Sequence, residues 1–375
     1  MADENTKLEK DFAHLARIAL TGREQDVQLL LHRAIKRYRA TFPMLADSLS
    51  ALLREAPTRA SPLRRQAESP LPVDSDSRLQ LLRVEPRPTL DHAPVFADEV
   101  ARKLHQLTAE RLKPDVLLRA GLEPTKTALF TGPPGVGKTL AARWLARELS
   151  RPLVTLDLAA VMSSYLGRTG GNLRHVLDYA KATECVLLLD ELDAIAKRRD
   201  DRGEIGELKR LVTVLIQEID DWPSTGLLVA ATNHSELLDP AIWRRFETVV
   251  AFPLPDQVAL LEFVNAQLMG KIDDPKTWAG VLSLCLQGAS FSEVESKLLL
   301  ARRAAALGEL PIEQALEQLV VTAELNKGDR IALATMLAES RVVSQRRAHE
   351  LTGVARETIR SHRNRSNPKP GDVSA

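Results

Sequence analysis

The sequence lacks several features that would assign it to a specialised class. Only two of its 375 residues are cysteines, Cys185 and Cys285. Two thiols cannot build a disulfide framework or a zinc cluster, which is typical of a reducing compartment. The net charge is only +1, so any nucleic-acid site must be local. No apolar run reaches the roughly 18 residues of a membrane span, and the N-terminus is acidic and polar. We therefore expect a cytoplasmic protein that makes no use of a membrane.

Apolar spacing and proline content divide the chain into five segments. Residues 1–55 have helical spacing and predict a bundle for recruitment or oligomerisation. Residues 56–78 contain four prolines among Ser, Arg and Asp, which is typical of a flexible linker. Residues 79–254 alternate apolar runs with helical stretches. Residues 255–325 and 326–375 are helical in pattern, and the last segment ends in a basic tail that we expect to be disordered.

Five short apolar runs in residues 79–254 predict an α/β domain, a five-stranded parallel sheet with helices on both faces. The runs are Ala128–Thr131, Leu153–Asp157, Val186–Asp190, Leu227–Ala231 and Thr248–Phe252.

A glycine-rich turn follows the first run. Residues 132–139 read Gly-Pro-Pro-Gly-Val-Gly-Lys-Thr, and a helical pattern follows from Leu140 to Leu149. The glycines let the backbone curl so that N–H groups converge on phosphates at a helix N-terminus. Lys138 reaches the β- and γ-phosphates, and Thr139 offers its hydroxyl to Mg²⁺. The expected nucleotide-binding residues are Gly132, Pro133, Pro134, Gly135, Val136, Gly137, Lys138, Thr139, Leu140 and Asp190.

Polar groups follow two later runs. Asp190 ends the apolar run Val186–Leu189 where the Mg²⁺ shell would lie, and Glu191 can polarise the attacking water. Asn233 follows the run that begins at Leu227 and can orient the same water. Without the glycine-rich turn of residues 132–139, a P-loop, the carboxylates would be compatible with a solvated helix start, and the amide with a turn.

Two adjacent arginines, Arg244 and Arg245, follow Asp239-Pro240-Ala241. In isolation they are compatible with ordinary surface charge. Phosphoryl transfer gains most from a cation at the γ-phosphate, however, and the P-loop contains no arginine.

The order of these motifs resembles the AAA+ ATPases from about Asp91 to Arg303. The resemblance implies an ATP-hydrolysing AAA+ sheet domain with an all-helical lid, using ATP and Mg²⁺. It also implies that Arg244 and Arg245 are fingers that complete the neighbouring subunit's site, in a homo-oligomeric ring, usually a hexamer. Their adjacency is most similar to the group that contains katanin, spastin and the ATPase that disassembles endosomal-sorting filaments. This chain has Phe291 at a position where members of that group carry a glycine.

Tyr165 and Leu166 resemble that group's first pore loop, in which an aromatic and an aliphatic residue grip a polypeptide. The alternative is an aromatic residue packed on its own domain. Residues 168–171 depart from the group's usual run, so substrate preference does not transfer. The charged stretch from Arg198 to Glu207 resembles a second pore loop and is equally compatible with a solvated charge run.

The C-terminal segment resembles a helix-turn-helix. Gly353 fits the turn, while Leu351, Val354 and Ile359 fit a small core. The second helix would expose Arg356, Arg360 and Arg363, which suits phosphate contacts. One departure is His349, where the pattern normally has alanine. The alternative is a packing or docking element.

These observations favour an ATP-driven protein unfoldase or remodeller. A partner protease would be a separate chain, because the sequence has no His-Glu-x-x-His motif. The alternative is a DNA-associated AAA+ regulator or loader that uses the C-terminal unit.

Overall fold

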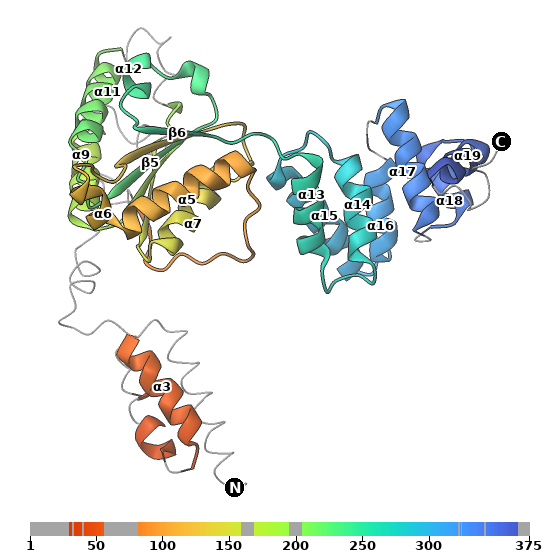
Figure 1. The fold of residues 1–375 in the computed structure, drawn as a ribbon, viewed down its shortest axis with the longest axis horizontal. Helices are drawn as coiled ribbons and strands as arrows, with labels where there is room; N and C mark the ends of the chain where they lie inside the picture. Colours follow the sequence, from red (N-terminus) through yellow and green to blue (C-terminus); the bar gives the residue numbers. More distant parts are fainter. Residues whose placement is uncertain are drawn as a thin grey trace. The chain divides into compact units, whose positions relative to one another are not determined.

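The computed structural model describes residues 30–31, 34–39, 41–55, 82–158, 169–194, 205–321, 323, 325–340 and 343–366. Two compact units divide between Pro70 and Leu71 (Figure 1). In the first unit, helix α3 (Pro43–Glu55) follows Tyr38 and Phe42. The rings of these two residues meet edge to face, with their centroids 6.0 Å apart. The expected linker of residues 56–78 lies outside the described residues.

The second unit contains a six-stranded sheet in the order β1-β3-β4-β5-β2-β6. The strands are β1 (Arg83–Glu85), β2 (Thr127–Thr131), β3 (Leu153–Asp157), β4 (Val186–Asp190), β5 (Leu227–Thr232) and β6 (Thr248–Ala251). All five predicted strands are present and pair in parallel. The sequence did not reveal β1, which pairs antiparallel with β3 and makes the sheet mixed. Its three residues, Arg-Val-Glu, are too few to carry a periodic pattern.

Helices cover both faces of the sheet because successive strand residues point to opposite sides. Leu187 and Leu189 of β4 belong to a buried cluster with α9 (Thr169–Ala182) and α11 (Ile205–Asp220). Leu188 of the same strand belongs to a cluster with α5 (Asp98–Leu112) and α7 (Lys138–Glu148). Figure 1 shows α5 and α7 on one face and α9 and α11 away from them. Shorter elements complete the domain: α6 (Pro114–Arg119), the 3₁₀-helix η2 (Ser235–Leu237) and α12 (Pro240–Trp243).

Seven helices follow the sheet domain in the described part of the chain. They are α13 (Gln257–Leu268), α14 (Pro275–Cys285), α15 (Phe291–Ala306), α16 (Ile312–Val321), α17 (Lys327–Glu339), α18 (Gln345–Thr352) and α19 (Arg356–Ser366). Side-chain N-caps begin several of them, and Ser290 with Glu293 forms a capping box at α15. A single hydrophobic cluster runs from Leu260 in α13 to Ile359 in α19. The helices before and after residue 325 therefore share one core. In the described part of the chain, no helix is both long and apolar enough to span a membrane.

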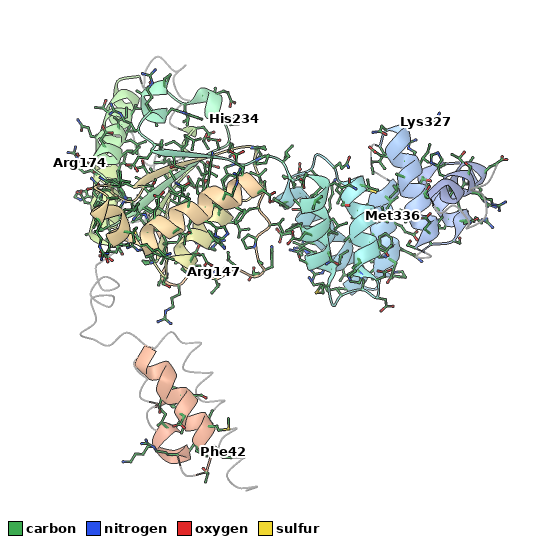
Figure 2. All side chains as sticks on the ribbon, in the orientation of Figure 1. Phe42, Arg147, Arg174, His234, Lys327 and Met336 are labelled. Atoms are coloured by element: carbon green, nitrogen blue, oxygen red, sulfur yellow. The ribbon has the colours of Figure 1, made fainter. Side chains whose placement is uncertain are left out.

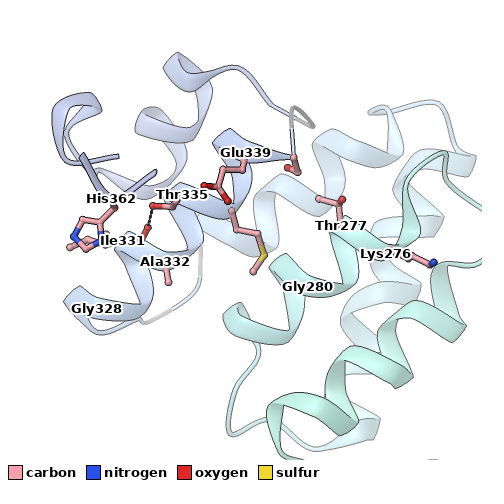
Figure 3. A pocket seen from close by; sticks show the side chains of 11 residues that line it. Lys276, Thr277, Gly280, Gly328, Ile331, Ala332, Thr335, Glu339 and His362 are labelled. Atoms are coloured by element: carbon pink, nitrogen blue, oxygen red, sulfur yellow. Dashed lines mark hydrogen bonds between the residues drawn. The ribbon is translucent and has the colours of Figure 1, made fainter. Parts of the chain in front are cut away.

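The interface between α14 and α17 shows how closely these helices pack. A Cβ placed at Gly280 of α14 would lie 3.2 Å from the Met336 sulfur of α17, so the absence of a side chain permits this approach. A groove of about 860 Å³ runs beside the contact, with His362 of α19 and Lys276 of α14 among its lining residues (Figure 3).

A half-buried ion pair attaches the edge strand β1 to α7. Arg143 Nε and Nη2 donate to Glu85 Oε2 and Oε1, each at 2.9 Å. The Arg143 hydrogen bonds lower the pKa of the Glu85 carboxyl. Bidentate geometry and partial burial distinguish this pair from an exposed surface contact.

We predict that Arg143→Ala lowers the free energy of unfolding by about 1–2 kcal/mol at pH 7, since hydrogen bonds to charged groups are lost. Because the pKa of folded Glu85 is lowered, the loss should be full above the ordinary glutamate pKa and should shrink as pH falls through about 4. Denaturant unfolding at several pH values measures it.

Arg147→Ala is the matched control. Arg147 lies one turn further along α7 and is exposed, and within the described part of the chain it forms an ion pair only with its neighbour Glu148 (Figure 2). An equal destabilisation in both variants would show that the Glu85 pair does not stabilise the domain.

Candidate functional site

A cavity of about 480 Å³ lies between the sheet domain and the lid helices. It is lined by residues 134–140 of the glycine-rich turn and α7, by Asp190, Glu191 and Asn233, by Asp91, His92, Pro94, Val95 and Phe96, and by Phe263, Phe291, Ser292 and Glu295. The structure thus brings together most of the predicted nucleotide-site residues. Gly132 and Pro133 do not line the cavity, but their carbonyl groups bind Lys138.

Two glycines of the turn occupy positions that no other residue could take without displacement. Gly132 has a φ of 140°, and a Cβ there would lie 2.1 Å from the Phe252 carbonyl oxygen. Gly135 has a φ of 76°, and its Cβ would lie 2.6 Å from Ser290 Oγ at the start of α15. The first glycine allows the turn to lie against the end of β6, and the second allows the lid to approach the turn.

The lid contacts the turn through its backbone. The Ser292 N–H of α15 donates to the Gly135 carbonyl at 3.1 Å. Phe291 of α15 and Phe263 of α13 meet with ring centroids 5.0 Å apart, and the His92 ring lies 5.9 Å from Phe263. These three rings make one wall of the cavity aromatic and suited to a flat ring system.

Lys138 is held by three oxygen atoms. Its Nζ donates to the carbonyls of Gly132 and Pro133 and to Asn233 Oδ1, each at 2.7 Å. The side chain is only 7% exposed. Burial lowers its pKa to about 8, while the charges of Asp190 and Asp193 oppose that shift. The ammonium group therefore links the turn to the end of β5.

Thr139 and Asp190 bring two oxygen donors together. Thr139 Oγ1 donates to Asp190 Oδ2 at 3.1 Å, and the Glu191 N–H donates to Asp190 Oδ1 at 3.0 Å. A hydroxyl and a carboxylate beside a phosphate site suit Mg²⁺, which usually takes one or two carboxylates together with phosphate oxygens. Glu191 has a φ of 55°, which is costly for a residue with a side chain. Its exposed side chain lines the cavity.

Asp193 is a buried carboxylate that our sequence analysis missed. It is 3% exposed, and Oδ1 accepts from Thr232 Oγ1 at 3.1 Å and from the Asn233 N–H at 3.3 Å. It therefore fixes the end of β5 from which Asn233 reaches Lys138. The available signal was the second aspartate in Asp190-Glu-Leu-Asp193.

The remaining predicted residues lie away from this cavity or outside the described residues. Arg244 and Arg245 follow α12 and are exposed, and neither lines the cavity. Arg245 pairs with Asp220 of α11 at 3.0 Å. Tyr165 and Leu166 lie outside the described residues, as does most of the charged stretch after Arg198. Residues 169–171 form the first turn of α9.

Comparison with known proteins agrees with this site. A family model described as "ATPase family associated with various cellular activities (AAA)" matches residues 128–254. An AAA family ATPase of Sinorhizobium fredii, y4kL, is 34% identical over 282 residues, which are 74% of this chain and 84% of that protein. The chain therefore belongs to the AAA family of ATPases and is an ATP-hydrolysing enzyme.

Other relatives are more distant. The proteasome-activating nucleotidase of Methanothermobacter thermautotrophicus is 30% identical over 59% of this chain and 60% of its own length. The 26S proteasome regulatory subunit 7 of Caenorhabditis elegans is 27% identical over 73% of this chain and 68% of its own length. The crystal structure of the FIGL-1 AAA domain has the same fold, with a TM-score of 0.53 and 18% identity over 69% of this chain and 92% of that one.

We predict that nucleotide binding takes up protons above pH 8. Lys138 has a folded pKa of about 8, and nearby phosphates favour its charged form and so raise the pKa. Affinity should therefore fall as pH rises above about 8, with an uptake approaching one proton per site. Calorimetry at alkaline pH in buffers of different ionisation heats measures the uptake. The Lys138→Arg variant, whose side chain stays charged, should bind nucleotide without taking up a proton. Equal proton uptake by the wild type and the variant would show that Lys138 is not the group that takes up the proton.

We also predict that Asp193→Ala lowers the free energy of unfolding by about 1–3 kcal/mol, because two buried donors lose their acceptor. It should weaken nucleotide binding as well, since Asn233 is released from its position beside Lys138. Asp193→Asn is the control, because its amide oxygen retains an acceptor. Denaturant unfolding and nucleotide titration report the two effects, and unchanged affinity in Asp193→Ala would exclude a positioning role.

Proposed function

We propose that this AAA ATPase is a Mg²⁺-dependent, ring-forming protein unfoldase or remodeller. The supporting observation is a cavity that is lined by Lys138, Thr139, Asp190, Glu191 and Asn233, but not by Arg244 or Arg245. The Lys138 ammonium group already donates to two backbone carbonyls and to Asn233. A second cation near the γ-phosphate would stabilise the charge that develops during phosphoryl transfer.

Within one subunit the roles follow from position. Lys138 and the N–H groups at the start of α7 would bind the phosphates, and Thr139 with Asp190 would hold Mg²⁺. The metal neutralises phosphate charge when bound. Glu191 accepts a proton from the attacking water, and Asn233 orients that water from the end of β5. Asp193 holds Asn233 in place.

Arg244 and Arg245 act on the neighbouring subunit. Both are exposed at the end of α12, which begins with Asp239 capping the Ala241 N–H at 2.9 Å. A short capped helix gives them a defined position on the surface. On this proposal the chain forms a hexameric ring in which each arginine pair reaches the nucleotide of the next copy.

The substrate is a polypeptide gripped by Tyr165 and Leu166. An aromatic side chain contacts varied sequences without specific hydrogen bonds, as threading requires. Two similar proteins carry names that associate them with the proteasome, which supports a protein substrate and a separate partner protease. The work takes place in the cytoplasm. The alternative, a DNA-associated regulator or loader, is favoured by the exposed arginines of α19.

Subunit mixing tests the shared site. Lys138→Ala removes nucleotide binding but leaves the arginines, whereas Arg244→Ala with Arg245→Ala does the reverse. Each preparation should be inactive, and an equal mixture should recover about one quarter of wild-type turnover, since half the sites have an intact P-loop and half of those an intact neighbour. A mixture no more active than its parts would place the arginines outside the neighbouring site.

Substrate grip is tested with Tyr165→Ala and a permanently unfolded polypeptide, reduced and carboxymethylated lactalbumin. The polypeptide should stimulate wild-type ATP turnover. The variant should keep its basal rate and lose the stimulation, because the aromatic side chain of Tyr165 makes the contact with the polypeptide. Turnover assays with and without the polypeptide decide this. Stimulation of the variant equal to that of wild type would show that Tyr165 does not grip the polypeptide.

A further inference from the structure

The three C-terminal helices carry a surface whose chemistry the ATPase site does not use. Helices α18 and α19 are joined by residues 353–355, and Gly353 has a φ of 70°. The Gly353 N–H donates to the His349 carbonyl at 2.8 Å, which ends α18. His349 Nδ1 donates across the turn to the Val354 carbonyl at 2.7 Å. His349, which departs from the expected alanine, therefore fixes this turn.

A small core fixes the orientation of α19. Leu351, Val354 and Ile359 are buried, with Ile359 only 1% exposed. They belong to the same cluster as Leu333 and Leu337 of α17. The side of α19 opposite this core is therefore presented to solvent in a defined position.

The arginines of α18 and α19 differ in their partners. On α18, Arg346 pairs with Glu350 at 3.0 Å, and Arg347 pairs with Glu317 of α16 at 2.5 Å. On α19, Arg356 and Arg360 are exposed and have no ion pair among the described residues. Their spacing of four residues places them on one side of the helix.

We propose that this face of α19 binds the phosphate backbone of double-stranded DNA. Unpaired arginines close together on one helix repel each other, and a duplex removes that repulsion while releasing condensed counterions. The 11 residues of α19 span about 16 Å, and the major groove, about 12 Å wide, admits such a helix. A helix that follows a tight turn and is fixed by its own small core is the arrangement that docks there.

The DNA-binding face is carried by the lid. The shared core and the Arg347–Glu317 pair join α18 and α19 to α16. The lid in turn contacts the nucleotide turn through the bond from Ser292 to Gly135. The DNA-binding face and the contact with the nucleotide turn thus belong to one helical body.

The test is fluorescence anisotropy of a random-sequence 20-base-pair DNA duplex titrated with the full-length protein over a range of salt concentrations. Wild type should bind at low salt, with log affinity falling linearly with log salt. Arg356→Ala with Arg360→Ala should reduce that slope by about 2 per bound subunit. Arg346→Ala is the matched control: it lies on α18 but is already paired, so the slope should stay unchanged. Basal ATP turnover should be equal in all three proteins.

Three results would overturn the proposal. These are no duplex binding at low salt, an unchanged slope in the double variant, or equally tight, arginine-dependent binding of a poly-glutamate peptide, which would indicate an acidic protein partner. Basal turnover, subunit mixing and the Tyr165→Ala assay do not involve DNA, so they report on the proposed remodelling function independently.

Discussion

The structure of the nucleotide site depends on the confinement of one ammonium group. Lys138 donates to two carbonyls of its own turn and to Asn233 at the end of β5. A buried charge is stable only when its donors are satisfied. Glycine at positions 132 and 135, the parallel pairing of β2 with β5, and the buried carboxylate of Asp193 all meet this requirement. Lys138, Thr139, Asp190 and Asn233 thereby line one cavity at the end of the sheet.

The hydrophobic core of the lid extends beyond residues 255–325, the segment expected from the sequence, as far as Ile359. Helices α17 to α19 complete its hydrophobic core, and Glu317, only 7% exposed, receives Arg347 from α18. Truncation near residue 325 would remove Leu333 and Leu337 from the shared core and leave Glu317 without its partner. Loss of activity after such a truncation would therefore reflect lid damage. Single exposed arginines are the informative positions, because their removal leaves the core intact.

Most of the sheet could be predicted because its strands are apolar on both faces and end in recognisable polar groups. The nucleotide turn was predictable because its glycines and its lysine lie within one short stretch, residues 132–139. Strand β1 was not, because three residues with two charges show no period. His92, Phe263 and Phe291 come from separate segments and meet only through tertiary packing. The bond from His349 to the Val354 carbonyl was equally hidden, since it depends on the conformation of the turn.

The central claim is that neighbouring copies complete each other's nucleotide sites. The most direct measurement is ATP turnover per subunit across a wide range of protein concentrations, with ultracentrifugation on the same samples. The account predicts that turnover rises with concentration and reaches a plateau where the ring has assembled. Constant turnover by a protein that sediments as a monomer throughout would contradict it.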